Sequence, residues 1–401
     1  MATRPQKSDS MAENELQDAL PDDQQEDSTD LALGNDWFSG PTLWSTDWTT
    51  ETVVTQLKRE NINLNPRFQR RNAWTNTRKS LFIESLILGL PIPQIILAEE
   101  KGRKGSFIVI DGKQRLMTLR QFLSEDDDQI FPQLKLADLE DRRDLNGMTY
   151  KRLQSDVSFR DDLNNFENQT IRTVVIRGWK DEKYLYSVFL RINTGSVQLS
   201  PQELRQALHP GDFSNFIDDF SVNSAELKSA MKLEQPDFRM RDVELVLRYF
   251  AYANFARTYG GDLKEFLDET IMHFNRSWKV ARPRILAQAE QFAESLKAIR
   301  EIFNERDQLR KWNGKMYEKR INRAVFDIMT YYFSDPQIRD RSIARSHHVK
   351  NGFQNLCATN REFLSALEST TKSREANKNR FTIWAAELSG VLEIDVASPM
   401  I

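Results

Sequence analysis

The chain has 401 residues, of which 39% are hydrophobic and 29% charged, with one cysteine, four histidines and a formal net charge of −3. This length allows two or three domains with a sizeable core, and the lone Cys357 excludes an internal disulfide or a thiolate metal cluster. The histidines have no zinc or hydrolase spacing, so any catalysis must rest on carboxylates, basic groups and amides. The sequence has no apolar run of membrane-spanning length and no signal-peptide pattern, so we expect a cytoplasmic protein without a membrane partner.

Acidic residues are concentrated near the N-terminus, where eight lie between Glu13 and Asp30. Such a stretch cannot bury enough apolar surface to offset its ordering entropy, so residues 1–35 are predicted to be a disordered acidic tail. Four aromatic residues that follow are interpreted as a strap packed on the first domain: Trp37, Phe38, Trp44 and Trp48. The remaining chain is mildly basic, which is weak support for a polyanionic partner, either nucleotide or nucleic acid.

Short strands alternate with helices over residues 36–210, which predicts a mixed α/β domain. Apolar periodicity predicts helices over 49–60, 77–88, 113–123, 149–163, 181–190 and 201–208. Runs of β-branched residues predict strands over 62–64, 94–98, 106–110 and 170–177. The stretch Ser200-Pro201-Gln202-Glu203 has the form of a capping box, which predicts the start of the last of these helices.

The strand signals end at Gly211, and residues 211–401 are predicted to form an all-α domain, so the fold class is α+β. Helical spacing covers 240–257, 263–274, 283–305, 321–333 and segments near 346–356, 361–369 and 380–391. A basic run interleaved with aromatic residues in this half could bind a nucleic-acid backbone, although a solvated helical face is the commoner explanation. Its candidate DNA-binding residues are Arg310, Lys311, Lys315, Lys319, Arg320 and Arg323.

The stretch from Phe107 to Leu119 carries the clearest functional signal. A β-branched run ends at Asp111, turns through Gly112 and leads into an amphipathic helix with a basic first turn. Free backbone N–H groups and the positive end of the helix dipole favour an anion at such a helix start, and Asp111 is placed to bind a metal or orient a water. The alternative is a simple turn in which Asp111 caps the helix.

Three polar segments share an order and spacing that is more specific than any one of them. They are Asn65–Arg70 with Trp74 and Ile83–Pro93, then Ile110–Leu116, and then Arg191–Gly195 with Leu199–Arg205. Together they resemble the N-terminal domain of GmrSD-type restriction systems, which looks like a branch of the ParB/sulfiredoxin-like fold. The resemblance spans roughly 48–210 and implies a nucleotide-binding module in bacterial defence against modified foreign DNA.

The resemblance also implies which residues build the site. Phosphates would be held by Arg115, Lys113 and the backbone of Gly112, with Asp111 binding Mg²⁺ or the attacking water. Gln69 and Arg70 would close the site, and Asn193 and Gly195 would shape its remaining wall. The catalytic residues are expected to be Asp111, Gln114 and Arg115. The family's Asp-Gly-Gln-Gln-Arg signature has Lys113 in place of its first glutamine here, and a lysine can hold a phosphate but cannot accept a proton from water.

The sequence leaves two functions open. The first is a regulator that binds an NTP, with Mg²⁺ as cofactor and with hydrolysis of the NTP in question because of Lys113. The second is a non-catalytic ParB-like module that senses a nucleotide or DNA and recruits a partner. The family's usual companion is a nuclease of HNH type, but His347-His348 lacks a second set of metal ligands. We therefore expect a separate nuclease or methyltransferase as partner.

Overall fold

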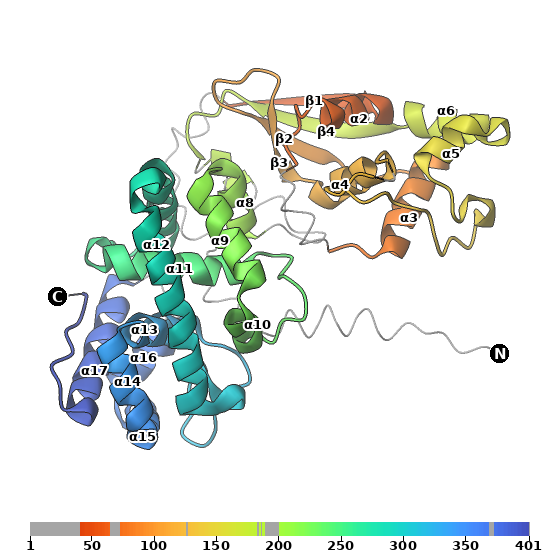
Figure 1. The fold of residues 1–401 in the computed structure, drawn as a ribbon. Coiled ribbons are helices and arrows are strands. Elements are labelled where there is room, and N and C mark those ends of the chain that lie inside the picture. The colour runs from red at the N-terminus through yellow and green to blue at the C-terminus, as the bar shows by residue number, and fades with distance from the viewer. Residues whose placement is uncertain are drawn as a thin grey trace, which may run out of the picture. The chain divides into compact units, whose positions relative to one another are not determined.

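The computed structural model describes residues 41–64, 73–125, 127–182, 184–185, 187–188, 200–368 and 373–400. The described chain divides into two compact units (Figure 1). The sheet unit ends at Leu208 and also contains Phe238–Met240, whereas the helical unit contains His209–Asp237 and the chain from Arg241 onward. The predicted fold class, a mixed α/β region followed by an all-helical region, is confirmed.

The sheet unit contains a four-stranded sheet in the order β1-β4-β2-β3. Its strands are β1 (Thr42–Thr49), β2 (Ile95–Glu99), β3 (Phe107–Asp111) and β4 (Thr170–Arg177). The pairs β1/β4 and β2/β3 are antiparallel, and β2/β4 is parallel, so the sheet is mixed. Three of the four predicted strands are confirmed, but 62–64 contributes only an isolated bridge between Ile62 and Phe107.

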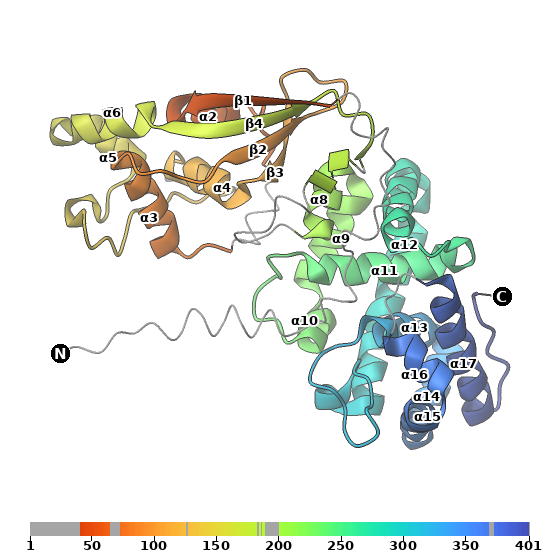
Figure 2. The ribbon, with the colours of Figure 1, turned by 180° about the vertical axis from the view of Figure 1, so that it is seen from behind.

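The aromatic residues after the acidic segment belong partly to a regular edge strand. Trp44 and Trp48 lie on β1, which pairs with β4 along its whole length (Figure 2). The ring of Trp44 is half-exposed and lies 3.9 Å from the guanidinium of Arg177. Trp37, Phe38 and the predicted tail 1–35 lie outside the described residues, so those interpretations stay predictions.

In the described part of the same unit, six α-helices accompany this sheet. They are α2 (Thr50–Lys58), α3 (Asn76–Ile87), α4 (Lys113–Phe122), α5 (Tyr150–Ser155), α6 (Arg160–Asn168) and α8 (Pro201–Leu208). Of these, α2 contacts β1 and α8 contacts β3. Leu204 of α8 packs in one apolar cluster with Ile96, Ala98 and Ile110 of β2 and β3. The predicted helix 149–163 is wrong as a single element, because the Asp156 carboxylate accepts a 2.9 Å hydrogen bond from a backbone N–H two residues later and ends α5.

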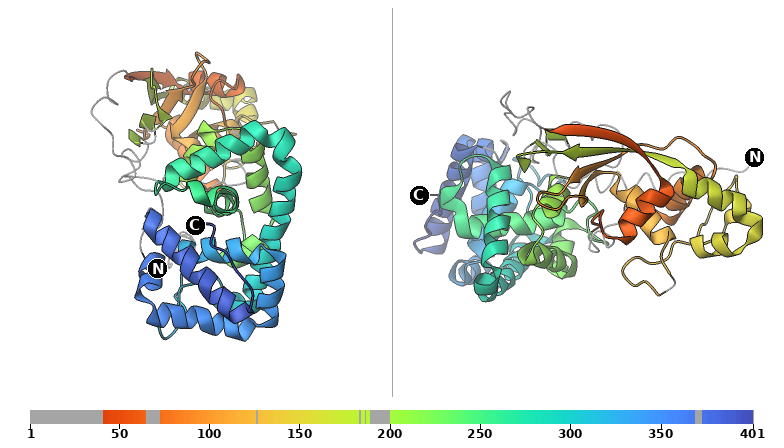
Figure 3. Two further views of the ribbon diagram at one scale, coloured as in Figure 1. Left: turned by 90° about the vertical axis from the view of Figure 1, so that its left-hand side faces the viewer. Right: turned by 90° about the horizontal axis from the view of Figure 1, so that it is seen from above.

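The helical unit contains the second half of the described chain, coloured green to blue in Figure 3. Its helices are α9 (Asp212–Asn223), α10 (Ala225–Met231), α11 (Arg241–Phe255), α12 (Leu263–Asp307), α13 (Arg323–Phe333), α14 (Pro336–Ala344), α15 (Ser346–Thr359), α16 (Arg361–Glu368) and α17 (Arg374–Leu392). The predicted helices 263–274 and 283–305 belong to one helix that runs through Pro283 and is interrupted only at Asn304, where φ is +63°. None of the described helices has an apolar stretch of the length that crossing a bilayer requires.

A buried charged cluster ties three helices of this unit together. Asp327 of α13 accepts hydrogen bonds from Arg248 Nε of α11 at 2.9 Å and from Arg380 Nη2 of α17 at 3.3 Å. All three side chains are 0% exposed. Burial alone would lower the pKa of Arg248, but the adjacent Asp327 carboxylate raises that pKa above its ordinary value. The three helices are therefore fixed by an ion cluster with no access to water.

The single thiol of the chain, Cys357, is also buried, and burial raises its pKa to about 12. Because the thiolate is the reactive form, we expect no reaction of the native protein with a disulfide reagent such as DTNB at pH 8. One thiol per chain should react once guanidinium chloride unfolds the protein. Rapid labelling of the native protein would show instead that α15 opens readily.

Candidate functional site

The candidate site lies where β3 passes into α4. Gly112 separates the two elements and is the N-cap of α4, with a left-handed φ of +96° and no side-chain capping bond. A Cβ at Gly112 would lie 3.0 Å from Cγ1 of Ile95, so the position favours glycine in both conformation and space. The predicted glycine turn is confirmed, and the alternative that Asp111 caps the helix is wrong, because Asp111 is the last residue of β3.

A β-bulge precedes this turn. In the β2/β3 pairing Asp111 lies opposite Ile96 and Val109 opposite Leu97, so Ile110 is the extra residue. A bulge re-aims the side chains that follow it and is common beside functional sites. Here it comes directly before the carboxylate of the motif.

Asp111 and Arg115 form the polar core of the site. Arg115 Nη2 donates to Asp111 Oδ2 at 3.0 Å and to the backbone oxygen of Gln94 at 2.9 Å. The Arg115 side chain is 6% exposed and that of Asp111 19%. Arg115 Nε is buried and has no hydrogen-bond partner among the described residues. The guanidinium is thus held by the end of β3 and by the loop before β2, and its Nε has no acceptor among the described residues.

Lys113 points away from this core. Its Nζ lies 2.6 Å from Glu203 Oε1, and the two side chains are only 3% and 4% exposed. The other oxygen, Glu203 Oε2, accepts a 2.7 Å bond from Ser200 N, and Ser200 Oγ accepts a 3.1 Å bond from Glu203 N. The predicted capping box is confirmed. Lys113 is thus paired with a buried carboxylate, and its contact with phosphate stays a prediction.

Gln114 lies between these two residues on the first turn of α4 and is half-buried. Its Oε1 is buried, and no residue in the described part of the chain is its hydrogen-bond partner. A buried polar atom left unsatisfied costs free energy unless a ligand or water completes it. Gln114 and Arg115 therefore each carry one buried polar atom for which the described residues supply no partner.

The other predicted contributors lie outside the described residues. Gln69 and Arg70 belong to the segment 65–72, and Asn193 and Gly195 to the segment 189–199. Their roles stay predictions.

The sequence did not predict that two further residues support the site. Gln94 supplies a backbone oxygen to Arg115, and Glu203 supplies the counter-ion of Lys113. The prolines Pro91 and Pro93 signal a restricted loop before Gln94. The capping box marks Glu203, but its second partner lies 90 residues away in the sequence.

A metal at this site would have few protein ligands. Within the part of the chain that the structure describes, no group of three or more His, Cys, Asp or Glu side chains could hold a metal ion. Asp111 is a single, partly exposed carboxylate. This fits Mg²⁺, which commonly takes one or two carboxylates and fills its remaining positions with phosphate oxygens and waters.

The six predicted DNA-binding residues differ in burial. Arg310, Lys311 and Arg323 are buried. Lys311 Nζ pairs with Glu368 at 2.6 Å, and Arg323 Nε lies 3.3 Å from Glu244. These three side chains are part of the packing of the helical unit, which disfavours direct DNA contact by them. Lys315, Lys319 and Arg320 are exposed, and their contact with DNA stays a prediction.

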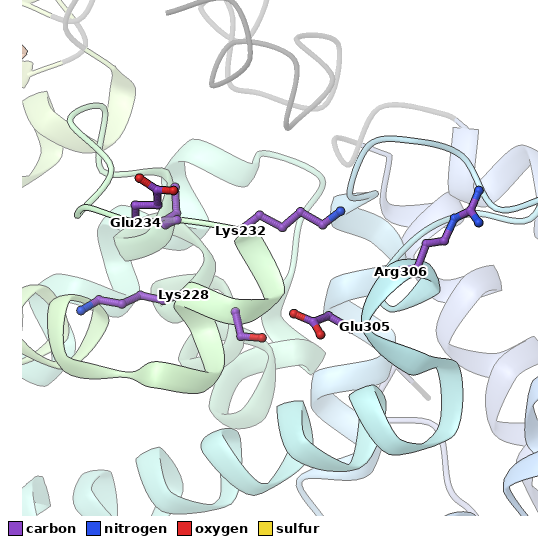
Figure 4. Close-up of a pocket in the computed structure, with 7 residues that line it drawn as sticks. Lys228, Lys232, Glu234, Glu305 and Arg306 are labelled. Atoms are coloured by element: carbon purple, nitrogen blue, oxygen red, sulfur yellow. The ribbon is translucent and has the colours of Figure 1, made fainter. Parts of the chain in front are cut away.

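The described cavities lie in the helical unit, away from the motif residues in the sequence. The largest, of about 510 Å³, is an open cleft between α10 and the end of α12. Its lining mixes Lys228, Lys232 and Arg306 with Glu234 and Glu305, and Lys228 extends away from the others (Figure 4). Opposite charges on one open surface do not select a ligand of either sign.

Comparison with known proteins finds a family match, which falls in the sheet unit and the two residues after Leu208. Residues 52–210 match the family described as GmrSD restriction endonuclease, N-terminal domain. This match confirms the resemblance stated above and contains both the β3–α4 junction and the Lys113–Glu203 pair. No curated protein and no solved structure matches the chain.

Proposed function

We propose that this protein, in which residues 52–210 are a GmrSD restriction endonuclease N-terminal domain, binds a nucleoside triphosphate as a regulatory component of a bacterial system that restricts modified DNA. The observation that carries the nucleotide proposal is the β3–α4 junction. A separate nuclease that cuts the DNA is part of the same proposal.

The start of α4 suits a phosphate. Gly112, the N-cap of α4, places no side chain at the start of the helix. The first backbone N–H groups of a helix have no intrahelical acceptor, and the helix dipole adds positive potential there. No capping side chain takes these donors at α4. Phosphate oxygens are the acceptors that such a helix start commonly binds.

Arg115 adds a fixed positive charge to this helix start. Its two bonds, to Asp111 and to the Gln94 backbone, hold the guanidinium without needing a ligand. Preorganised donors stabilise phosphate charge more than mobile ones, because they lose little freedom on binding. The free Nε–H of Arg115 is the donor that a phosphate oxygen would complete.

Asp111 and Gln114 supply the remaining chemistry. When bound, Mg²⁺ would neutralise phosphate charge and polarise the bond to be broken. Asp111 would be its protein ligand, since this carboxylate is partly exposed. In the hydrolytic form of the proposal Gln114 Oε1 accepts the hydrogen bond of the attacking water. Position 113 cannot do so, because a lysine ammonium has no acceptor and this one is paired with Glu203.

Titration calorimetry of the full chain with ATP, GTP, CTP and UTP, each with MgCl₂, tests the proposal, together with a phosphate-release assay. We expect micromolar binding of at least one nucleotide, and Asp111→Ala should abolish the dependence of binding on Mg²⁺. Asp144→Ala is the matched control, because it removes an exposed, ion-paired carboxylate of the same unit from a short 3-10 helix. Binding without turnover would support the non-catalytic alternative. Absence of binding for all four nucleotides would overturn the proposal.

A further inference from the structure

We infer that a buried chain of hydrogen bonds couples the candidate nucleotide site to the peptide that leads into helix α11. Nucleotide binding would then make this peptide more ordered. The inference rests on the proposed function and adds the regulation of that site. We call this chain the relay. It consists of Lys113, Glu203, Ser200 and the backbone oxygen of Arg239.

The first link is the ion pair of Lys113 and Glu203. Lys113 is the first residue of α4, so it adjoins the proposed phosphate position. Both side chains are almost fully buried, with Nζ 2.6 Å from Oε1. Separating a buried pair leaves an uncompensated charge in a medium of low dielectric, which is strongly unfavourable. The start of α4 and the start of α8 are therefore expected to move together.

The second link is the hydroxyl of Ser200, the N-cap of α8. Ser200 Oγ accepts from Glu203 N at 3.1 Å and donates to the backbone oxygen of Arg239 at 2.5 Å. A hydroxyl has a single proton, so its donor capacity is used entirely on Arg239. The capping box thus serves two purposes, which are to start α8 and to hold a peptide 39 residues further along the chain.

The third link is the peptide Phe238–Met240 itself. These residues belong to the sheet unit, although the chain on both sides belongs to the helical unit. Met240 is fully buried and has a left-handed φ of +55°, which is unusual for a residue with a long side chain. Asp237 and Arg241 close the two ends of the peptide with an ion pair of 2.6 Å. The peptide is therefore held in a strained conformation by contacts at its ends and its centre.

Strained segments that are held by surrounding contacts are suited to switching, because loss of one contact releases them. A phosphate bound at the start of α4 would order the first turn of that helix and so strengthen the Lys113–Glu203 contact. Through the relay, the peptide at Arg239 and the first turn of α11 would become more ordered as well. By reciprocity, a partner that fixes the start of α11 would tighten nucleotide binding.

Hydrogen exchange of the full chain, measured by mass spectrometry, tests the relay first without ligand. Ser200→Ala removes the bond to Arg239 and should speed amide exchange in peptides covering 238–242 by at least about tenfold. Thr149→Ala is the matched control, since Thr149 caps α5 in the same unit through its own side chain and has no bond to this peptide. Unchanged exchange in Ser200→Ala would overturn the relay.

The second arm adds MgCl₂ with each of the four NTPs in turn. The nucleotide that binds should slow exchange over 238–242 in the wild-type chain, and Ser200→Ala should still bind it but lose this protection. Binding without any change over 238–242 in the wild type would overturn the coupling while leaving the proposed function intact. If no nucleotide binds, the proposed function and the coupling both fail, and the ligand-free arm still decides whether the relay exists.

Discussion

Replacing Asp327 by alanine should lower the free energy of unfolding of the helical unit by about 3–5 kcal/mol, because it leaves buried charges without their counter-ion. The carboxylate is the acceptor for both Arg248 and Arg380, and all three side chains have no exposed surface. Three nitrogen atoms of these arginines, Arg248 Nη1 and Arg380 Nε and Nη1, already have no hydrogen-bond partner among the described residues of the wild type. Guanidinium chloride denaturation followed by circular dichroism measures the loss.

Asp340→Ala is the control for this substitution. Asp340 also pairs with an arginine, at 3.7 Å, but its side chain is 75% exposed. Exposed pairs contribute little to stability, so this variant should unfold like the wild type. Equal stability of the Asp327 and Asp340 variants would show that the buried arginines do not depend on the carboxylate.

Substitution of Gly112 by alanine should destabilise the sheet unit by about 2–5 kcal/mol, of which about 1–2 comes from the left-handed backbone and about 1–3 from crowding. The new Cβ would lie 3.0 Å from Ile95 Cγ1 and 3.3 Å from Arg115 Nη2. The guanidinium would have to shift, so nucleotide affinity should fall as well. Thermal unfolding and titration calorimetry measure the two effects.

Gly102→Ala separates the two contributions. Gly102 has a similar φ of +76° in the same unit, but a Cβ there would meet no atom within 4 Å. Only the backbone cost of about 1–2 kcal/mol should appear, and nucleotide binding should be unchanged. A Gly112 variant no worse than the Gly102 variant would mean that the site tolerates a side chain at the turn.

Local signals in the sequence predicted local structure well. The capping box at Ser200 and the turn at Gly112 are confirmed because both depend on residues within one helical turn. The two-helix prediction for α12 is wrong, since the helix runs on through Pro283, which removes one N–H without ending it. A proline within a helical pattern marks a probable helix boundary and not a certain one.

The partners of charged residues could not be predicted, because they lie far apart in the sequence. Lys113 was predicted to hold phosphate from its place in the motif, yet Glu203 comes from 90 residues away. Arg323 was predicted to contact DNA as part of a basic run, yet it is fully buried beside Glu244 of α11. A count of charges along the chain does not show whether a basic side chain faces water or pairs with an acidic side chain inside the fold.

The edge position of β1 has a practical consequence for anyone who isolates the family domain. The match begins at residue 52, after the strand Thr42–Thr49 has ended. A fragment cut at that boundary would uncover the full length of β4, whose Ile171 and Ile176 are fully buried in the intact chain. Unpaired strand edges recruit other strands, so the fragment would tend to aggregate. Solubility of the excised domain therefore depends on eight residues that lie before the recognised family boundary.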